Sequence, residues 1–432
     1  MMKSFHQAAA RAARFTIGAL LCAASPGLSA GAAENPKKVY ELPGIVVVAD
    51  LAETPLDQTG SSVTVITRAD IERSQKATVL ELLRQTPGLD VVQSGGPGGQ
   101  TSVFMRGGAS EHTLVLIDGV EMNDPSSPNG AYDFAQLSAD NIERIEILRG
   151  SQSVLYGSDA IAGVISIITR NSKGPSQASF SAELGSFNTK RASAFVSSTR
   201  ERVSYTLSAS RFETDGISAT TVTGAGIPED DSFARTSISG RMRYNVSPSV
   251  TASLSLRALE SETELDKGFL LSPPGGVRED PNFVGKGRQF FLQSAIKYAS
   301  SDSPWRITGN AAVSAHSRET LDLPDNVFGP GASNSFFEGE QIKFRIIGEA
   351  RPLDWNRIVA GVETEREQVS LKQIGGVNAR TTGFFLTDRV NIADRLFINA
   401  GLRYDTLETF GGQTGQTTYR ITGSFQVRET GT

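Results

Sequence analysis

Few residues in this chain have the types and spacing that catalysis needs. Beyond residue 33 the histidines are His112 and His316, far apart in the sequence, and the single cysteine is Cys22. General acid–base or nucleophilic catalysis needs such a side chain beside a serine, a second base or a paired carboxylate. No serine nucleophile elbow, zinc-binding spacing or pair of catalytic carboxylates accompanies these residues. The sequence therefore predicts a protein that is not an enzyme.

Two polar stretches have the composition of ligand-contacting loops. The first, Ser94–Gln100, is rich in glycine but lacks the Lys and the Ser or Thr of a phosphate-binding loop. The second runs from Asn123 to Asp133 and is rich in Asn, Asp and Ser. Both stretches can equally be flexible linkers, and composition alone leaves the two interpretations open.

The first 33 residues have the pattern of a secretory signal peptide. Lys3, Arg11 and Arg14 precede an apolar run at residues 15–24. Small residues follow at Ser29, Ala30, Ala32 and Ala33. A membrane-spanning helix would need about 20 apolar residues, roughly twice this run. We therefore expect a signal peptide over residues 1–33, cleaved near Ala33, which also removes the only thiol.

Charge and hydropathy narrow the class of protein further. Removal of residues 1–33 takes away three basic residues and no acidic ones, so the formal charge falls from -5 to -8. An acidic exported protein is a poor binder of nucleic acid. No later stretch approaches 18 apolar residues, so no spanning helix is expected. A closed β-barrel is the other structure that satisfies every backbone polar group in lipid.

Residues 53–172 are expected to form a mixed α/β domain. Thr67 with Asp70, and Thr78 with Glu81, are capping-box pairs that predict the starts of two short helices. Alternating and β-branched residues between glycine-rich connections predict strands. The expected strands are Thr101–Arg106, Thr113–Asp118, Ile142–Arg149 and Val164–Thr169.

Residues 173–432 lose the helical signals and alternate between apolar and polar residues. In one segment Val203, Tyr205 and Leu207 alternate with Ser204 and Thr206. We count about 12 such segments of roughly the length that a tilted membrane strand needs. Long polar connections are expected at Thr214–Ser232, Ser261–Lys286 and Ser317–Phe337, with tight turns between them. A β-sandwich is the alternative, but it would not place arginine on the facing side of strand after strand.

Four blocks of sequence resemble TonB-dependent outer-membrane receptors. They are Val103–Gly108 (VFMRGG), Leu114–Val120 (LVLIDGV), Ile142–Gly150 (IERIEILRG) and Val154–Thr169 (VLYGSDAIAGVISIIT). The resemblance extends from about Ile45 to the end of the chain. It implies an N-terminal mixed α/β plug domain followed by a transmembrane antiparallel β-barrel, which has 22 strands in the family.

The resemblance assigns residues 34–52 to a periplasmic leader that contains the TonB box. The box corresponds to Ile45, Val46, Val47, Val48 and Ala49. Its partner is TonB, energised by the inner-membrane ExbB/ExbD complex, and docking adds the box as an edge strand. On composition alone the same residues can be the first strand of the plug.

The family also implies where substrate is bound. Contact would fall to two plug loops, through Ser94, Gly95, Gly96 and Gln100 in the first and through Asn123, Asp124, Asn129, Tyr132 and Asp133 in the second. The block at Val154–Thr169 is most similar to the cobalamin-transporter branch, so cobalamin is the expected substrate. A ferric siderophore is the alternative small nutrient chelate.

In the cobalamin branch, aspartates of the first long loop bind calcium. Here Asp215, Glu229, Asp230 and Asp231 supply the hard oxygen ligands that calcium prefers. The Asp-Asn-Asp-Gly rhythm of that branch is missing. A solvated acidic loop is therefore the alternative, and calcium is the only cofactor that the sequence suggests.

The resemblance places the protein in the outer membrane of a Gram-negative bacterium, in contact with lipid and with the barrel-assembly machinery. Barrels of the family normally end in an aromatic residue, whereas this sequence ends at Arg428–Thr432. We therefore expect a C-terminally truncated barrel that does not close by itself. A non-functional truncated barrel fragment is then a further alternative to a working receptor.

Overall fold

The computed structural model describes residues 45–46, 54–127, 130–172, 174–218, 230–265, 267–268, 277–278, 283–300, 303–322, 333–371 and 375–427. These residues belong to the contact-defined unit Pro43–Thr432, which is separate from Met1–Leu42. The expected signal peptide therefore lies outside the described residues, and so do Val47, Val48 and Ala49 of the expected TonB box.

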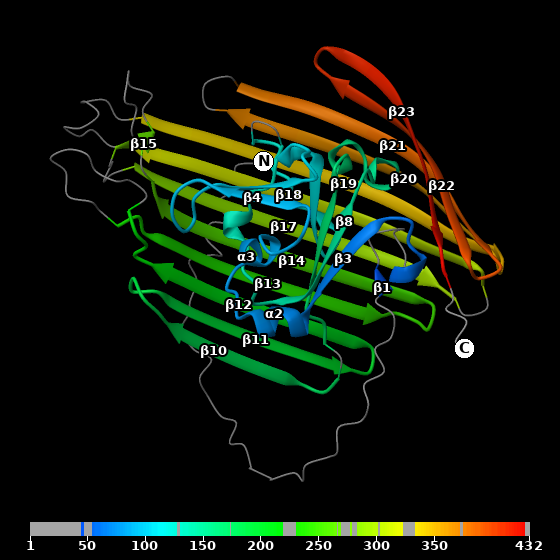
Figure 1. Cartoon of the computed structure of the whole chain (residues 1–432), viewed down its shortest axis with the longest axis horizontal. Helices are drawn as coiled ribbons and strands as arrows, with labels where there is room; N and C mark the ends of the chain where they lie inside the picture. The colour runs from blue at the N-terminus through cyan, green and yellow to red at the C-terminus, as the bar shows by residue number, and fades with distance from the viewer. Residues whose placement is uncertain are drawn as a thin grey trace, which may run out of the picture. The chain divides into compact units, whose positions relative to one another are not determined.

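A five-stranded mixed sheet forms the centre of the plug region (Figure 1). Its order is β3 (Ser62–Thr67), β8 (Ile142–Arg149), β9 (Gly163–Thr169), β6 (Thr113–Ile117) and β7 (Val120–Glu121). β6 and β9 are parallel, whereas the other neighbours are antiparallel. β4 (Leu89–Gln93) and β5 (Thr101–Met105) form a separate pair. The four expected strands are confirmed to within one residue at each end, whereas β3 and β4 were not predicted.

Two short helices of the plug begin at the capping boxes that the sequence predicts. α2 spans Arg68–Ser74 and α3 spans Val79–Leu83, and each begins with a complete capping box. The remaining short helical turns are α4 (Ser153–Tyr156), η1 (Leu56–Gln58), η2 (Ser110–His112), η3 (Phe134–Gln136) and η4 (Ser158–Ala160). In the part of the chain that the structure describes, no helix is long and apolar enough to cross a membrane.

The plug region has its own apolar core. Leu83, Met105, Ile145, Ile147 and Ile165 are all fully buried within one cluster. Gly163, at the start of β9, has φ +155°, and a Cβ there would lie 2.2 Å from the Leu148 carbonyl oxygen. Glycine is therefore the residue that lets β9 pack this closely against β8.

The second region is a twelve-stranded antiparallel sheet in which neighbours follow chain order. Its strands are β10 (Gln177–Leu184), β11 (Lys190–Arg200), β12 (Val203–Thr214), β13 (Phe233–Asn245), β14 (Val250–Glu264), β17 (Phe283–Ala299), β18 (Trp305–Asp322), β19 (Ser333–Leu353), β20 (Asn356–Leu371), β21 (Gly375–Ile392), β22 (Leu396–Thr409) and β23 (Gly412–Phe425). Thr206 is 4% exposed and the adjacent Leu207 is 57% exposed. The polar face is therefore the one turned toward the plug, and the expected fold class is confirmed.

Several strands of the sheet are longer than the sequence predicts. As a result, the connections expected at Ser261–Lys286 and Ser317–Phe337 are shorter. β18 continues to Asp322 and β19 begins at Ser333, inside the connection expected at Ser317–Phe337. Side-chain alternation weakens there, but backbone pairing continues because each added residue satisfies further N–H and C=O groups. A small pair, β15 (Lys267–Gly268) with β16 (Val277–Arg278), also lies inside an expected loop.

We call the end of the sheet with the β12–β13, β14–β17 and β18–β19 connections the long-connection end, and the opposite end the short-turn end.

Candidate functional site

The expected TonB box begins as a strand that is already paired. β1 (Ile45–Val46) forms an antiparallel ladder with β2 (Thr54–Pro55), in which Val46 is opposite Thr54. Two residue pairs make a short ladder, and a longer strand from a partner can replace it through the same backbone groups. Docking of the box to TonB stays a prediction.

Two arginines of the sheet hold the residue that pairs with this box. Thr54 is fully buried, and its hydroxyl oxygen accepts hydrogen bonds from Arg357 (3.3 Å) and Arg389 (3.0 Å). Arg389 also donates to the backbone carbonyl and the side-chain oxygen of Gln58, at 3.3 and 2.9 Å. Both arginines lie near the short-turn end of β20 and β21. The segment that follows the box is therefore anchored to the sheet at that end.

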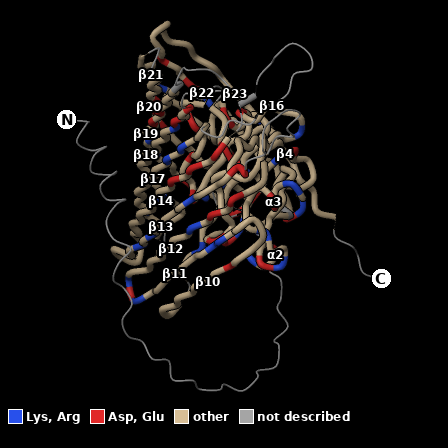
Figure 2. The backbone as a smooth tube through the Cα atoms, turned by 90° about the vertical axis from the view of Figure 1, so that its left-hand side faces the viewer, with Lys and Arg blue, Asp and Glu red and all other residues tan. Residues whose placement is uncertain are grey.

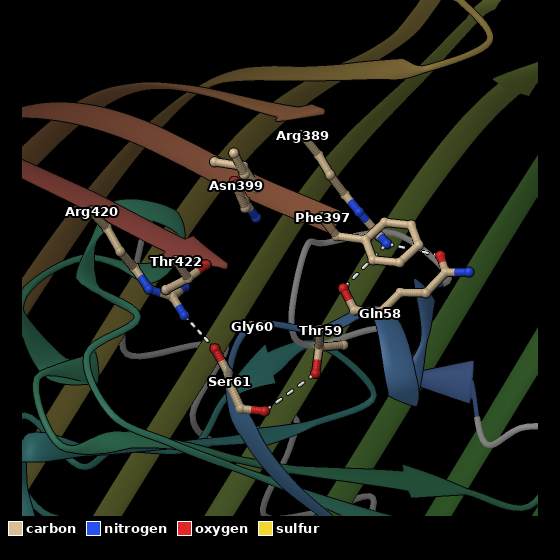
Figure 3. A pocket seen from close by; sticks show the side chains of 10 residues that line it. Gln58, Thr59, Gly60, Ser61, Arg389, Phe397, Asn399, Arg420 and Thr422 are labelled. Carbon is tan, nitrogen blue, oxygen red and sulfur yellow. Dashed lines mark hydrogen bonds between the residues drawn. The ribbon is translucent and has the colours of Figure 1, made fainter. Parts of the chain in front are cut away.

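A small pocket surrounds the next residues of the same segment (Figure 3). Its volume is about 10 Å³, and Gln58, Thr59 and Ser61 face Arg389, Phe397 and Arg420 across it. Arg420 donates to the Ser61 hydroxyl and, at 2.6 Å, to Gln152 of the plug. This volume holds about one water. The pocket is thus a tight joint between chain segments rather than a ligand site.

Among the described residues, ion pairs join the plug to the sheet at four further places. Each has an acid on the plug and a cation on a different strand, and basic and acidic residues recur along these strands (Figure 2). The pairs are Asp140 with Arg191, Asp118 with Arg241 (3.3 Å), Asp124 with Arg318 (3.1 Å) and Glu121 with Lys343 (2.6 Å). The plug therefore presents its acids to a basic surface of the sheet.

The pair at β7 belongs to a larger buried network. Lys343 also contacts Glu365 at 2.5 Å, so this ammonium group lies between two carboxylates. Burial raises the pKa of Glu121, although the Lys343 charge opposes that shift. Next to it, Glu363 accepts from both Arg345 and Arg403. These contacts couple the plug to strands β19, β20 and β22.

Larger open space lies beside this network. A cavity of about 570 Å³ separates part of β6 and β7 from the sheet, and Asp118, Glu121, Arg241, Arg306 and Lys343 are among its lining residues. Cavities of this size accommodate small organic molecules. The interface between plug and sheet is therefore not filled by side chains.

The first predicted substrate loop lies at the long-connection end. Ser94 donates through its backbone to Gln100 (2.9 Å), and Gln93 donates to the Gly96 carbonyl (2.7 Å). These bonds close Ser94–Gln100 into a defined loop, which disfavours the flexible-linker interpretation. Gly98, at φ +83°, lies so close to Phe233 at the start of β13 that a Cβ would be 2.2 Å from its ring. Ser94, Gly95 and Gln100 remain exposed, and Gly96 is half-buried; their contact with substrate stays a prediction.

The second predicted loop is largely turned inward. Asn123, Asp124 and Tyr132 are at most 6% exposed. Asn123 accepts from the Val115 backbone at 3.0 Å, and Asp133 accepts from Thr101 and Ala135 at 2.9 and 3.0 Å. Asn123 and Asp133 hold the loop in place because they accept hydrogen bonds from its backbone surroundings, and Asp133 is half-buried. Asn129 lies outside the described residues.

The residues proposed for calcium are only partly brought together. Asp215 and Asp230 are exposed, whereas Asp231 is 3% exposed, and Glu229 lies outside the described residues. Asp215 accepts from the Asn188 amide at 3.3 Å. Among the residues that the structure describes, no group of three or more His, Cys, Asp or Glu side chains is placed to hold a metal ion. Calcium binding stays a prediction.

Sequence reasoning missed the sheet residues that contact the plug, although a signal was present. Arg241, Lys343, Arg357, Arg389 and Arg420 all occupy polar positions of alternating strands. Within the plug, Arg144 forms an ion pair with Glu146 at 2.7 Å. Arg149 donates to the Thr64 hydroxyl, and burial lowers the pKa of Arg149.

Comparison with known sequences identifies the N-terminal domain. The sequence model of the TonB-dependent Receptor Plug Domain matches residues 55–164. The Vitamin B12 transporter BtuB of Vibrio vulnificus (strain CMCP6) is 28% identical over 403 residues, which are 89% of this chain and 62% of that protein. The chain thus spans less than two thirds of the length of this relative.

Solved structures share the fold at low sequence identity. The siderophore receptor PirA from Acinetobacter baumannii superposes with a TM-score of 0.65 at 18% identity, over 85% of this chain and 59% of PirA. P. aeruginosa FpvA, solved with heterologous pyoverdines, gives a TM-score of 0.73 at 12% identity, over 90% of this chain and 57% of FpvA. The likeness to these structures shows the fold: a mixed plug sheet followed by consecutive antiparallel strands. With the match of residues 55–164, the N-terminal region of this chain is a TonB-dependent receptor plug domain.

Proposed function

We propose that the protein is an outer-membrane receptor of a Gram-negative bacterium for TonB-dependent, energy-coupled uptake of a scarce nutrient chelate. The observation that carries this proposal is the joint at the short-turn end. There the first two residues of the TonB box pair with β2, and Arg357 and Arg389 hold the paired Thr54. A pull on the box from the periplasm would reach the plug through this segment.

Two features support the direction of transport. The defined loop Ser94–Gln100 lies at the long-connection end, which is the cell exterior in outer-membrane barrels. The box lies on the segment held at the opposite end, where a periplasmic partner would reach it. Between them the plug contacts the sheet through ion pairs beside a cavity of about 570 Å³. Such contacts can rearrange without loss of the apolar plug core.

Cobalamin is the substrate that we favour, because a relative that is 28% identical is a vitamin B12 transporter by name. A ferric siderophore is the second candidate, supported by the fold shared with siderophore receptors. Uptake of labelled cyanocobalamin and of labelled ferric siderophores by cells that produce the protein would separate them. Cobalamin uptake that a calcium chelator weakens would also support the metal prediction. Siderophore uptake without cobalamin binding would overturn our preference.

The coupling step can be tested at Val46. Val46→Pro removes a backbone donor from the box, and we expect energised uptake to fall at least about tenfold while ligand binding stays within about twofold. Val46→Ala keeps the backbone and serves as the matched control. Equal loss of binding and uptake in Val46→Pro would assign the segment to the plug fold and would contradict TonB docking. Uptake that survives collapse of the proton gradient would indicate a passive pore instead.

A further inference from the structure

Two arginines of the sheet and one tyrosine of the plug have buried polar atoms without a hydrogen-bond partner, although Arg257 as a whole is only half-buried. They are Arg235 on β13, Arg257 on β14 and Tyr132, just before η3. Arg235 and Tyr132 are each 3% exposed. Arg235 Nη1, Arg257 Nε and the Tyr132 hydroxyl have no hydrogen-bond partner among the described residues. A buried polar atom that makes no hydrogen bond lowers the stability of the folded protein, so a bound ligand or water is expected to supply the missing partner.

Strand register places the two guanidinium groups on the same face of the sheet. Arg235 is opposite Ser261, and Ser261 and Arg257 are four residues apart on β14. Because side chains alternate along a strand, both arginines point toward the plug. The charges of both act on the Tyr132 hydroxyl, which burial nevertheless keeps protonated with a pKa of about 12. The three groups therefore form one cluster.

Among the described residues, no carboxylate forms an ion pair with Arg235 or Arg257. The acids whose charges act on Arg257 and Arg235 are Asp118 and Asp140, and Asp133 acts on Tyr132. The first two are already paired elsewhere, Asp118 with Arg241 at 3.3 Å and Asp140 with Arg191. Asp118 additionally accepts from the backbone and hydroxyl of Thr169, at 3.0 and 2.6 Å.

Arginine cannot give up its proton inside a protein, so the excess charge persists. Two guanidinium groups close to a phenol hydroxyl offer several donors and two positive charges. This combination matches the planar or tetrahedral oxygens of a carboxylate or a phosphate. A neutral ligand or water alone would satisfy the hydrogen bonds but would leave both charges without a counter-ion.

We propose that Arg235, Arg257 and Tyr132 form a binding site for an anionic oxygen group, a carboxylate or a phosphate, of the transported ligand. The site lies beside the Ser94–Gln100 loop, because Gly98 packs on Phe233, two residues before Arg235. Phe212 lies under the Arg235 guanidinium, 5.8 Å from ring centroid to Cζ, and helps to fix its position. The identity of the anion as part of a transported ligand rests on the proposed function.

Binding of the free anions tests the site directly. The full chain in detergent is titrated calorimetrically with citrate and with inorganic phosphate as separate probes. Arg235→Gln and Arg257→Gln should each weaken binding of the preferred anion at least about tenfold, because each removes a charge-assisted hydrogen bond. Tyr132→Phe should weaken it several-fold and keeps the test open if an arginine variant does not fold.

Arg211→Gln is the matched control, since Arg211 lies on the neighbouring strand β12, is half exposed and pairs with Glu213. It should change binding by less than about twofold, as expected for an exposed pair. Preference for citrate would indicate a carboxylate ligand, and preference for phosphate a phosphate-bearing one. Absence of binding to both anions, or equal weakening in Arg211→Gln, would overturn the proposal.

Uptake measurements separate this inference from the proposed function. With an anionic and a neutral ferric chelate, Arg235→Gln should reduce uptake of the anionic one alone. Val46→Pro should reduce uptake of both at least about tenfold and leave anion binding unchanged. Anion binding by a protein that transports nothing would contradict the proposed function and leave the site standing. Equal reduction of both chelates by Arg235→Gln would contradict the site and leave the function standing.

Discussion

The core of the plug and its contact with the twelve-stranded sheet are built from opposite chemistry. The core is apolar, with Leu83, Ile145 and Ile147 fully buried in one cluster. The contact is ionic, with Asp118, Glu121 and other plug acids against arginine and lysine of the sheet. Apolar packing holds a domain together internally, whereas ion pairs beside an open cavity can exchange their partner for water.

This difference separates two properties that the proposed transport would require of the plug. The plug would have to stay folded while it moves, and it would have to release the sheet when a force acts on it. Deep burial of aliphatic side chains provides the first property, because cavities in such a core are costly. Contacts such as Asp118–Arg241 provide the second, because water can replace either partner. We therefore expect core changes to unfold the plug and interface changes to loosen it.

The largest effect is expected from a cavity in the core. Ile147 on β8 is fully buried, and Ile147→Ala should lower the free energy of plug unfolding by about 3 kcal/mol. Hydrogen exchange of β8 and β9 amides in the full chain measures this change. Val92→Ala on β4, where Val92 is 57% exposed, is the control and should change it by less than about 0.5 kcal/mol. Similar effects at both positions would mean that the plug has no distinct core.

Local features of the plug could be predicted from the sequence because their determinants are close together. Thr67 and Asp70 stand three residues apart, and their capping box appears as expected at the start of α2. Strand β8 has its expected bounds, since Ile142, Ile145, Ile147 and Leu148 recur within one run of eight residues. β4 was missed because Leu89–Gln93 is short and has only partial alternation.

The candidate site could be predicted only in outline. Arginines at alternating strand positions indicated a polar face, but no local pattern states that Arg389 meets Thr54 or that Lys343 meets Glu121. These partners are hundreds of residues apart in the chain. The loop from Asn123 to Asp133 looked like a surface loop by composition. Its side chains turn inward because Asn123 and Asp133 accept from backbone donors that the fold buries.

A smaller effect is expected where the interface loses a charge. Lys343→Met leaves Glu121 and Glu365 without their shared cation, and loss of one partner of a buried pair is strongly destabilising. Because burial raises the pKa of Glu121, this carboxyl can take up a proton and relieve part of the cost. We expect β7 to open more easily by about 2 kcal/mol, with the plug core unchanged.

Hydrogen exchange that resolves β7 from β8 distinguishes this local loosening from unfolding. Lys286→Met is the matched control, since Lys286 on β17 forms an exposed pair with Glu262 at 3.4 Å. Exposed pairs contribute roughly 0–1 kcal/mol, so this variant should resemble the parent protein. Uniform loss of protection across β7 and β8 in Lys343→Met would show that the interface and the core unfold as one unit.

The smallest effect on plug stability concerns the carboxyl group of Asp133, which links the end of the Asn123–Asp133 loop to Thr101, just after the Ser94–Gln100 loop. Asp133 accepts from the Thr101 and Ala135 backbones through one oxygen, and desolvation raises its pKa to about 6 despite these bonds. Its unfolded pKa is about 3.9, so the folded plug binds the proton more tightly. The sign follows from linkage: this contribution is complete below about pH 4 and is lost as the pH rises through about 6. Plug stability should therefore fall by about 1–2 kcal/mol between pH 4 and pH 7 through this group, the lower part of the range reflecting its partial exposure.

Asp133→Asn keeps the accepting oxygen and removes the titration, so it should flatten this part of the profile and stabilise the plug at pH 7. Hydrogen exchange of the β5 amides at several pH values, corrected for intrinsic rates, measures both effects. A steeper loss of stability at pH 7 in Asp133→Asn would show that the ionised carboxylate is required to hold Thr101 and Ala135.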